Sequence, residues 1–214
     1  LSEIEQHQPS LIFIAYPNNP TGVCFKREEV EAVVRAATGI VVVDEAYGAF
    51  HHDSFLPWAG EVENLVVMRT ISKIGFAGLR MGYAAASPGI IGELAKILPP
   101  YNMNQLSLAA AKFSLKHHPI IQQNIDTLKN ERSRVMNELS KLNRLQVFPS
   151  EANFITVRVP DADELFETLK QNRIVIKKLH GSHPLLDQCV RITIGSAAQN
   201  DAVLAVIKNL YPNL

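Results

Sequence analysis

Lys73 stands in a glycine-containing loop between two apolar runs, and its chemistry is the first feature to explain. The run 65–68 precedes it and the run 81–85 follows it, and both have the composition of strands. The carboxyl ends of strands are where α/β proteins bind ligands. Desolvation there disfavours an ammonium group, and the neutral amine is the form that attacks an aldehyde. Lys73 is therefore a candidate for Schiff-base chemistry, although a single Ser-Lys pair is also common in solvated loops.

Other reactive residues follow neighbouring strands in the same pattern. Asn19 lies in a proline-rich turn after the apolar run 11–15, and Asp44 and Tyr47 follow the apolar run 40–43. A helix is expected between these two runs, over residues 26–37, and this spacing is typical of a parallel βαβ unit. The Asn19 turn and Asp44 should therefore lie at the same carboxyl edge of one sheet.

The remaining elements indicate a second, smaller domain after a long helix. The run 11–15 lacks alternation, as expected for a strand covered on both faces. Helices are expected over 88–98, 105–116, 120–142, 161–171 and 200–210, and further strands over 145–148, 153–158, 174–176 and 190–194. The sequence predicts an α/β chain in which a mostly parallel sheet with helices on both faces (1–118) precedes a connecting helix and a small α+β domain (119–214).

Composition argues against several other classes of function. The 214 residues carry 21 Lys and Arg against 21 Asp and Glu, and no block of like charge suggests nucleic-acid or membrane binding. No apolar run is long enough to cross a bilayer, and no targeting leader is recognised. Cys24 and Cys189 lack the spacing of a disulfide framework or zinc site, so we expect no metal and a reducing, cytoplasmic location.

Taken together, several segments resemble the histidinol-phosphate aminotransferases, which are fold-type I pyridoxal-phosphate (PLP) enzymes of the class II aminotransferase family. The segments are Pro17-Asn-Asn-Pro-Thr-Gly22, Val43-Asp-Glu-Ala-Tyr47, Arg69-Thr-Ile-Ser-Lys73, Ala77-Gly-Leu-Arg-Met-Gly-Tyr83 and Val190-Arg-Ile-Thr-Ile-Gly195. The resemblance implies a remnant of the PLP-dependent transferase large domain followed by the small C-terminal domain. Relatives carry a further segment before this one, so we expect a C-terminal portion that by itself binds PLP weakly or not at all.

The resemblance implies that Lys73 holds the cofactor and, as the free amine, later moves a proton. Asp44 keeps the ring nitrogen of PLP protonated, which makes the ring an electron sink. Tyr47 and Asn19 supply neutral donors for the phenolic oxygen. A cis peptide bond before Pro20 is also implied.

The remaining implied roles concern anionic groups. Ser72 and Arg80 bind the cofactor phosphate, with the hydroxyl of Thr70 alongside. Arg191 takes the substrate's carboxylate or phosphate through its planar guanidinium. Lys177 stands near the substrate phosphate, where the family often has an arginine. A lysine supplies positive charge there but cannot make the two parallel hydrogen bonds of a guanidinium.

The expected activity converts imidazole acetol phosphate and glutamate to histidinol phosphate and 2-oxoglutarate in histidine biosynthesis, in a homodimer. An aromatic-amino-acid aminotransferase and a threonine-phosphate decarboxylase of the same fold are alternatives. A further alternative is the non-catalytic PLP-sensing domain of a transcription regulator. His180 and His183 flank a Gly-Ser turn and could contact an imidazole or a phosphate.

Overall fold

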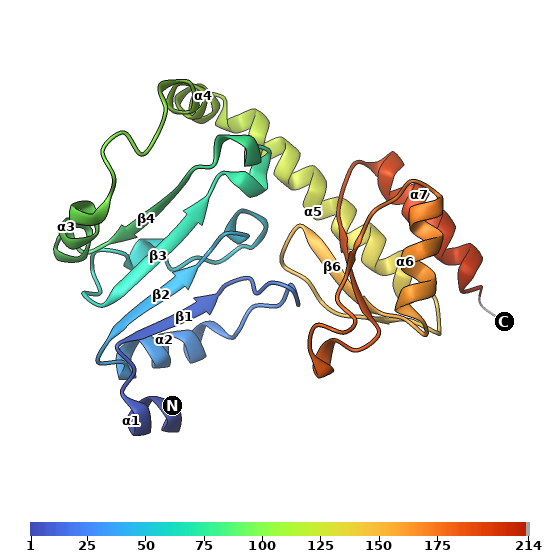
Figure 1. The fold of residues 1–214 in the computed structure, drawn as a ribbon, viewed down its shortest axis with the longest axis horizontal. Coiled ribbons are helices and arrows are strands. Elements are labelled where there is room, and N and C mark those ends of the chain that lie inside the picture. Colours follow the sequence, from blue (N-terminus) through green and yellow to red (C-terminus); the bar gives the residue numbers. More distant parts are fainter. Residues whose placement is uncertain (213–214) are drawn as a thin grey trace. The chain divides into compact units, whose positions relative to one another are not determined.

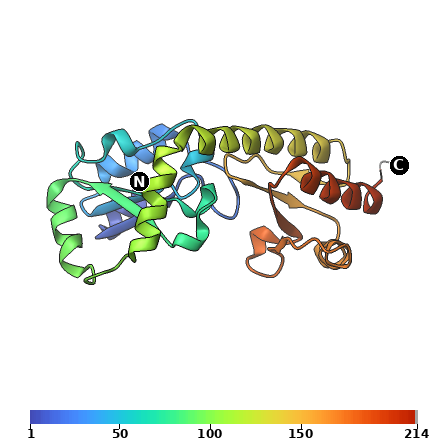
Figure 2. The ribbon, with the colours of Figure 1, turned by 90° about the horizontal axis from the view of Figure 1, so that it is seen from above.

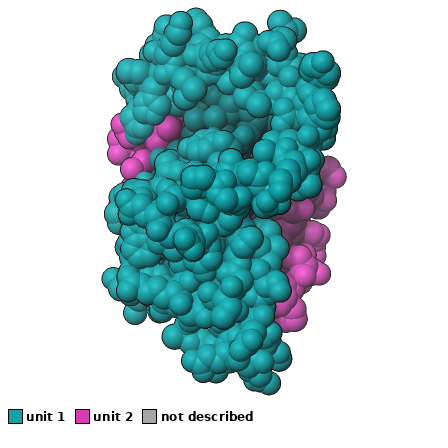
Figure 3. Space-filling view, turned by 90° about the vertical axis from the view of Figure 1, so that its left-hand side faces the viewer, with its two compact units in different colours: residues 1–18, 24–123 teal, residues 19–23, 124–214 magenta. Residues whose placement is uncertain are grey.

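The computed structural model describes residues 1–212, which form two units. The first comprises Leu1–Asn18 and Cys24–Gln123, and the second comprises Asn19–Val23 and the described residues from Asn124 onward. Figure 3 colours the first unit teal and the second magenta. The units divide within one long helix, and the domain boundary expected between residues 118 and 119 stays a prediction.

The first unit is built on a four-stranded sheet in the order β1-β2-β3-β4 (Figure 1). Strands β1 (Leu11–Ala15), β2 (Ile40–Asp44) and β3 (Leu65–Thr70) are parallel, and β4 (Gly82–Ala86) runs antiparallel to β3. Helix α2 (Arg27–Ala36) joins β1 to β2. The predicted parallel βαβ unit is therefore confirmed.

Apolar side chains fix helix α2 against one face of this sheet. Val30 and Val34 of α2 are buried in one cluster with Val41, Val43 and other side chains of β2 and β3. Their spacing of four residues places both on the same side of the helix. The other α-helices that lie wholly within this unit are α1 (Ser2–His7), α3 (Pro88–Ile97) and α4 (Gln105–Lys116).

Strand β1 differs from its prediction. Phe13 is 65% exposed and Leu11 is 50% exposed, so among residues 1–212 nothing covers one face of this strand. The expectation of a strand covered on both faces is wrong for the described chain. Leu11 and Phe13 are two residues apart and therefore lie on the same face of the strand, and no element within residues 1–212 buries that face. Strand β1 is also an edge strand, without a paired strand on its outer side within residues 1–212.

The second unit has an antiparallel sheet in the order β5-β6-β8-β7. Its strands are β5 (Gln146–Val147), β6 (Phe154–Arg158), β7 (Lys177–Lys178) and β8 (Cys189–Thr193). Helices α6 (Ala162–Gln171) and α7 (Ala197–Leu210) contact each other, and α5 (His118–Ser140) is one continuous helix in Figure 2. Their buried side chains form one core that includes Val135, Leu139, Ile155, Val157, Leu165, Leu169, Val190, Ile192, Leu204 and Ile207. The expected small α+β domain is present.

One local prediction is wrong. No strand forms over 174–176, because the amide of Ile174 donates to the carbonyl of Leu169 and closes the end of α6 instead. Helix α1 at the start of the chain has Glu3 and Glu5 in its first turn, where acidic groups stabilise a helix. Short 3₁₀ helices form at Gly48–Phe50, Leu56–Trp58, Ser72–Ile74, Ala77–Leu79 and Pro184–Leu186. Within residues 1–212, no helix has the length and apolar character needed to span a membrane.

Candidate active site

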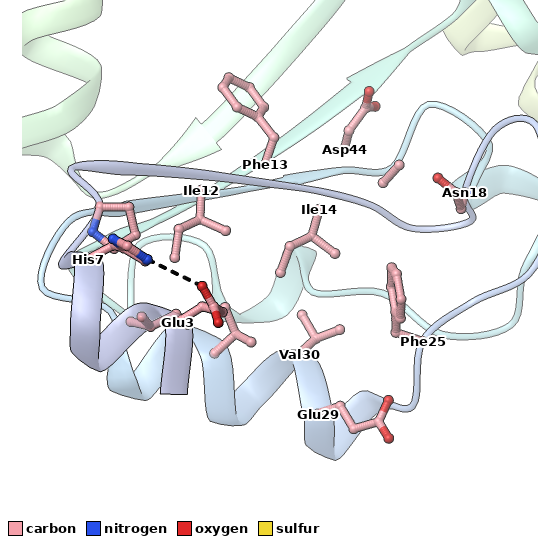
Figure 4. Close-up of a pocket in the computed structure, with 14 residues that line it drawn as sticks. Glu3, His7, Ile12, Phe13, Ile14, Asn18, Phe25, Glu29, Val30 and Asp44 are labelled. Atoms are coloured by element: carbon pink, nitrogen blue, oxygen red, sulfur yellow. Dashed lines mark ion pairs between the residues drawn. The ribbon is translucent and has the colours of Figure 1, made fainter. Parts of the chain in front are cut away.

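The segments after β2 and β3 bring most of the candidate residues of the first unit to one edge of its sheet. Asp44 is the last residue of β2 and pairs in register with Met68 of the adjacent parallel strand. One carboxylate oxygen of Asp44 accepts a hydrogen bond from the Ala46 amide at 2.9 Å. Figure 4 shows the Asp44 side chain on the same side of the sheet as Phe13 and opposite Ile14. The local turn therefore fixes the Asp44 carboxylate at the strand end.

Lys73 lies beside Tyr47. The Nζ atom of Lys73 is 5.1 Å from the centre of the Tyr47 ring, within the range of a cation–π contact. Tyr47 is buried and Lys73 is half-buried. No described residue forms a hydrogen bond or ion pair with the Lys73 amine. The amine is thus held near an aromatic face while its hydrogen-bonding capacity stays available.

The loop that carries Lys73 also carries groups suited to an anion. The Thr70 hydroxyl oxygen lies 2.9 Å from that of Ser72 and accepts from the Ser72 amide at 3.1 Å. The same hydroxyl lies within hydrogen-bond distance of the Met81 carbonyl, at 2.9 Å. Arg80 is exposed, and its guanidinium has no hydrogen bond or ion pair to any residue in 1–212. Thr70 therefore braces the loop, while Ser72 and Arg80 present donors.

In the second unit, Arg191 and Asn19 lie together although they are far apart in sequence. The Nη1 atom of Arg191 donates to the side-chain oxygen of Asn19. The Arg191 guanidinium carbon lies 4.9 Å from the centre of the Phe154 ring. The hydroxyl of Thr156, the register partner of Arg191 on β6, donates to the Pro20 carbonyl. The Asn19 turn is therefore anchored on strands β6 and β8.

The peptide bond between Asn19 and Pro20 is cis, which confirms that prediction. A second cis bond, between Tyr16 and Pro17, was not predicted.

Lys177 and the two histidines occupy neighbouring parts of the second unit. Lys177 on β7 is the register partner of Arg191, and its exposed amine has no ion pair within the described residues. The His180 Nδ1 atom lies 2.7 Å from an Asp187 carboxylate oxygen. The His183 Nδ1 atom accepts from the Leu185 amide at 3.1 Å. Each histidine thus has a partner within its own loop.

The sequence interpretation missed two charged residues that stand close in sequence to the candidate catalytic residues. Glu45 and Arg69 form an ion pair, with the Nη2 of Arg69 2.7 Å from the Oε2 of Glu45. Burial lowers the pKa of the Arg69 guanidinium, but the hydrogen bonds and charge of Glu45 outweigh it and raise that pKa above its ordinary value. Their position in the sequence could have drawn attention to them, because each lies inside a segment that carries the family resemblance.

A pocket of about 680 Å³ lies along β1 in the first unit (Figure 4). Its lining is mostly apolar and comes from α1, β1 and α2, with Ile12, Ile14 and Val30 on its inner side. Asn18 and Asp44 contribute polar atoms, and Glu3 and His7 form an ion pair at 3.4 Å. Of the predicted site residues, this pocket includes Asp44 and not Lys73 or Arg80.

Comparisons with known proteins agree on one family. The model for aminotransferase class I and II matches residues 1–207. Over 211 residues the chain is 70% identical to a histidinol-phosphate aminotransferase of Neisseria meningitidis serogroup C, and the match covers 99% of this chain and 58% of that protein. The chain therefore spans somewhat more than half the length of this relative.

Two solved structures with similar folds also carry the name histidinol-phosphate aminotransferase. The histidinol-phosphate aminotransferase from Clostridium acetobutylicum gives a TM-score of 0.90 at 28% identity, with 100% of this chain and 66% of that chain covered. The enzyme from Sinorhizobium meliloti, in complex with pyridoxal-5′-phosphate, gives a TM-score of 0.86 at 27% identity, with 98% and 60% covered. The expected fold of a PLP-dependent transferase is thereby confirmed.

Proposed function

Because the chain belongs to the class I and II aminotransferase family, we propose that the protein containing it is a PLP-dependent histidinol-phosphate aminotransferase. The reaction transfers the amino group of glutamate to imidazole acetol phosphate, giving histidinol phosphate and 2-oxoglutarate, within cytoplasmic histidine biosynthesis. The observation that carries the substrate assignment is the 70% identity to a histidinol-phosphate aminotransferase over nearly the whole chain. This identity favours histidinol phosphate over the aromatic amino acids and threonine phosphate.

The donor set of the first unit fits PLP, which when bound supplies an electron sink for the substrate's Cα electrons. Asp44 has one oxygen engaged by the Ala46 amide, which leaves the other to hold a proton on the ring nitrogen. The guanidinium of Arg80 and the hydroxyl of Ser72 lie on one loop, where they suit a phosphate. Gly75, in the same loop, has a φ of +110°, a conformation that glycine adopts without strain.

Lys73 is suited to attach the cofactor and to move the proton of the substrate. Its amine lacks an ion pair within residues 1–212, so no charged neighbour there has to be displaced before it reacts. The Tyr47 ring, 5.1 Å from the amine, limits the positions that the amine can take. The Lys73 Nζ accepts the proton from the substrate Cα and later returns a proton to the product.

Arg191 and Asn19 divide the remaining polar contacts between them. The side-chain oxygen of Asn19 is occupied by Arg191, so its amide nitrogen is the group left to donate to the phenolic oxygen of the cofactor. Arg191 keeps a second terminal nitrogen for the substrate's carboxylate or phosphate. Lys177, its register partner on β7, adds positive charge for the phosphate group of histidinol phosphate.

A homodimer is the proposed assembly. Apolar side chains of the first unit are exposed on several elements, including Phe13 of β1 at 65% and Tyr83 of β4 at 50%. Surfaces of this kind are typical of interfaces, and closed two-fold dimers are the commonest homo-oligomers. A second copy presents the same apolar side chains, and a two-fold interface would bury both sets.

The decisive experiment is a substrate comparison on the purified protein that contains this chain, at the length of its relatives. We expect its kcat/KM for histidinol phosphate to exceed that for phenylalanine by about 100-fold, because phenylalanine has no phosphate to accept charge-assisted hydrogen bonds, which are worth about 1.5–3 kcal/mol each. Equal or better use of phenylalanine would favour an aromatic aminotransferase. Release of carbon dioxide from threonine phosphate would favour a decarboxylase. PLP binding without any turnover would favour a PLP-sensing domain.

A further inference from the structure

The ion pair between Glu45 and Arg69 joins the two segments that carry the candidate catalytic groups. The Glu45 side chain is 0% exposed, and that of Arg69 is 26% exposed. The Oε2 atom of Glu45 accepts from the Nε of Arg69 at 2.9 Å and from its Nη2 at 2.7 Å. This geometry fixes the plane of the guanidinium as well as its distance from the carboxylate.

A third segment closes the cluster from the loop after β2. The Oε1 atom of Glu45 accepts from the Phe55 amide at 2.6 Å, and the Ser54 hydroxyl donates to Oε2 at 2.8 Å. The Ser54 hydroxyl oxygen in turn accepts from the Nη2 of Arg69 at 2.8 Å. Both carboxylate oxygens are therefore hydrogen-bonded, which is the condition under which a buried ion pair is tolerated.

Gly48 leaves room for this cluster in the turn that contains Tyr47. A Cβ atom at position 48 would lie 3.0 Å from the Glu45 Cβ and 3.3 Å from its Oε2. The turn is also held by a hydrogen bond from the Gly48 amide to the Glu45 carbonyl, at 2.9 Å. The side chain of Glu45 therefore occupies the space that a side chain at position 48 would need, next to Tyr47 in the sequence.

The residues of the cluster are close in sequence to the reactive groups on both strands. Glu45 directly follows Asp44 and comes two residues before Tyr47, and Arg69 comes four residues before Lys73. The Glu45 amide donates to the Met68 carbonyl at 2.8 Å, so the backbones are joined at the same level. The ends of β2 and β3 are therefore joined both by a backbone hydrogen bond and by the ion pair.

We propose that Glu45 and Arg69 are positioning residues, whose ion pair sets where the Lys73 amine lies relative to Tyr47 and Asp44. The proposal rests on the function assigned above, and both residues act through their neighbours in sequence. Stability alone does not require this pair, because apolar side chains of similar volume are often as stabilising as a buried ion pair. The proposed contribution of the ion pair is to fix the relative positions of the ends of β2 and β3.

The first test uses Glu45→Gln, with Asp53→Asn as the matched control, in the PLP-loaded protein that contains this chain. Asp53 lies on the same loop as Ser54 and accepts from its amide, but its ion pair is with Arg27 and not with Arg69. We expect E45Q to lower kcat by about 100-fold, since small misplacements of reacting groups have effects of this size. KM for histidinol phosphate should change much less. D53N should keep the wild-type kcat.

A second test separates positioning from loss of stability. The double variant Glu45→Gln with Arg69→Met carries no unpaired buried charge, so it should regain most of the folding stability that E45Q loses. A positioning role predicts that kcat stays low in this double variant. A kcat that recovers together with the urea midpoint would overturn the proposal.

A third test needs neither cofactor nor turnover. The lysines of the cofactor-free protein are methylated with ¹³C, and the Lys73 resonance is assigned by its loss in Lys73→Arg. The ring current of the nearby Tyr47 side chain affects the chemical shift of this resonance. We therefore expect the Lys73 chemical shift to differ from wild type in E45Q and to equal it in D53N. An unchanged resonance in E45Q would overturn the proposal. A changed resonance in a protein without transaminase activity would instead reject the proposed function and retain the positioning role.

Discussion

The guanidinium of Arg191 donates a hydrogen bond to the side chain of Asn19, which lies 172 positions earlier in the chain. Arg191 also lies over the Phe154 ring, and its Nε atom is buried without a hydrogen-bond partner among the described residues. An aromatic face and an amide oxygen therefore hold the guanidinium in one plane. This arrangement makes the planar shape of Arg191, in addition to its charge, important for binding a carboxylate or a phosphate.

Arg191→Lys should raise KM for both glutamate and histidinol phosphate. Lysine keeps the positive charge but cannot make two parallel hydrogen bonds to an anion while it also donates to Asn19. A charge-assisted hydrogen bond is worth about 1.5–3 kcal/mol, which corresponds to a rise in KM of about ten- to a hundredfold. Steady-state kinetics with each substrate varied in turn measures the effect.

Arg158→Lys is the matched control, since Arg158 lies on the neighbouring strand β6 and donates to the carbonyls of Leu185 and Asp187. Both KM values should stay near those of the wild type. If R191K also left them unchanged, Arg191 would not be a substrate-binding residue.

Lys73→Ala should abolish the visible absorbance of the lysine-bound cofactor and lower kcat by about 1,000-fold, within the range for loss of a general base. The control is Lys96→Ala, because Lys96 is exposed and pairs with Glu93 at 2.6 Å. The 214-residue chain alone should show little of this absorbance. A strong absorbance in the isolated chain that disappears in K73A would contradict the expectation of weak binding.

The sequence predicts the reactive groups better than the contacts that support them. Asp44, Tyr47 and Lys73 follow apolar runs at short distances, so their place at one sheet edge follows from the βαβ pattern. The pairing of Glu45 with Arg69 could not be predicted in this way. It depends on the loop that brings Ser54 and Phe55 under the strand ends, and loop conformation has no periodic signal.

The error at residues 174–176 has a different origin. Ile174 and Ile176 pack against the core of the second unit, while Val175 between them is 80% exposed. This alternation is typical of a strand, but a strand also needs a hydrogen-bonded neighbour. That pairing begins only at Lys177, where β7 meets β8.

Asp53 should make stability depend on pH. Burial raises the pKa of its carboxyl group, but hydrogen bonds from Arg27 and the Ser54 amide outweigh this effect, so the pKa lies below the ordinary 3.8. A carboxyl group with a lowered pKa in the folded state stabilises the protein above its unfolded pKa. This contribution is lost as the pH falls through the folded value. Stability should therefore decrease below about pH 4.

Urea unfolding of wild type and Asp53→Asn, at about pH 6 and about pH 3, tests this contribution. At the higher pH, D53N should lower the free energy of unfolding by about 1.5–3 kcal/mol, as for the loss of a hydrogen bond to a charged group. At the lower pH the difference between the two proteins should shrink. Glu61→Gln is the control, since exposed Glu61 has no ion pair within residues 1–212. An equal difference at both pH values would exclude this role for Asp53.

Ser196→Ala should destabilise the second unit by about 1 kcal/mol through the loss of the N-cap of α7. Ser196 and Gln199 form a capping box, in which the Ser196 amide donates to the Gln199 side chain at 2.9 Å. The hydroxyl of Ser196 accepts from the Gln199 amide in return. The urea midpoint is the measurement, and Ser140→Ala at the exposed end of α5 is the control with no expected change.

Lys177 should distinguish the two substrates that Arg191 treats alike. Its position opposite Arg191 on the adjacent strand places a second positive charge on the same sheet, and its exposed amine is not paired with an acidic group in residues 1–212. Lys177→Ala should raise KM for histidinol phosphate by about fivefold, equivalent to about 1 kcal/mol for an exposed charge pair. KM for glutamate should not change, because glutamate carries no phosphate.

Two further variants sharpen this prediction. Lys177→Arg should lower KM for histidinol phosphate, because a guanidinium binds phosphate through two parallel hydrogen bonds where an ammonium acts as a point charge. Lys178→Ala removes the adjacent charge, which is already paired with Asp163, and should leave both KM values unchanged. Equal increases for glutamate and histidinol phosphate in K177A would show that Lys177 affects the site generally, and its assignment to the phosphate would then be wrong.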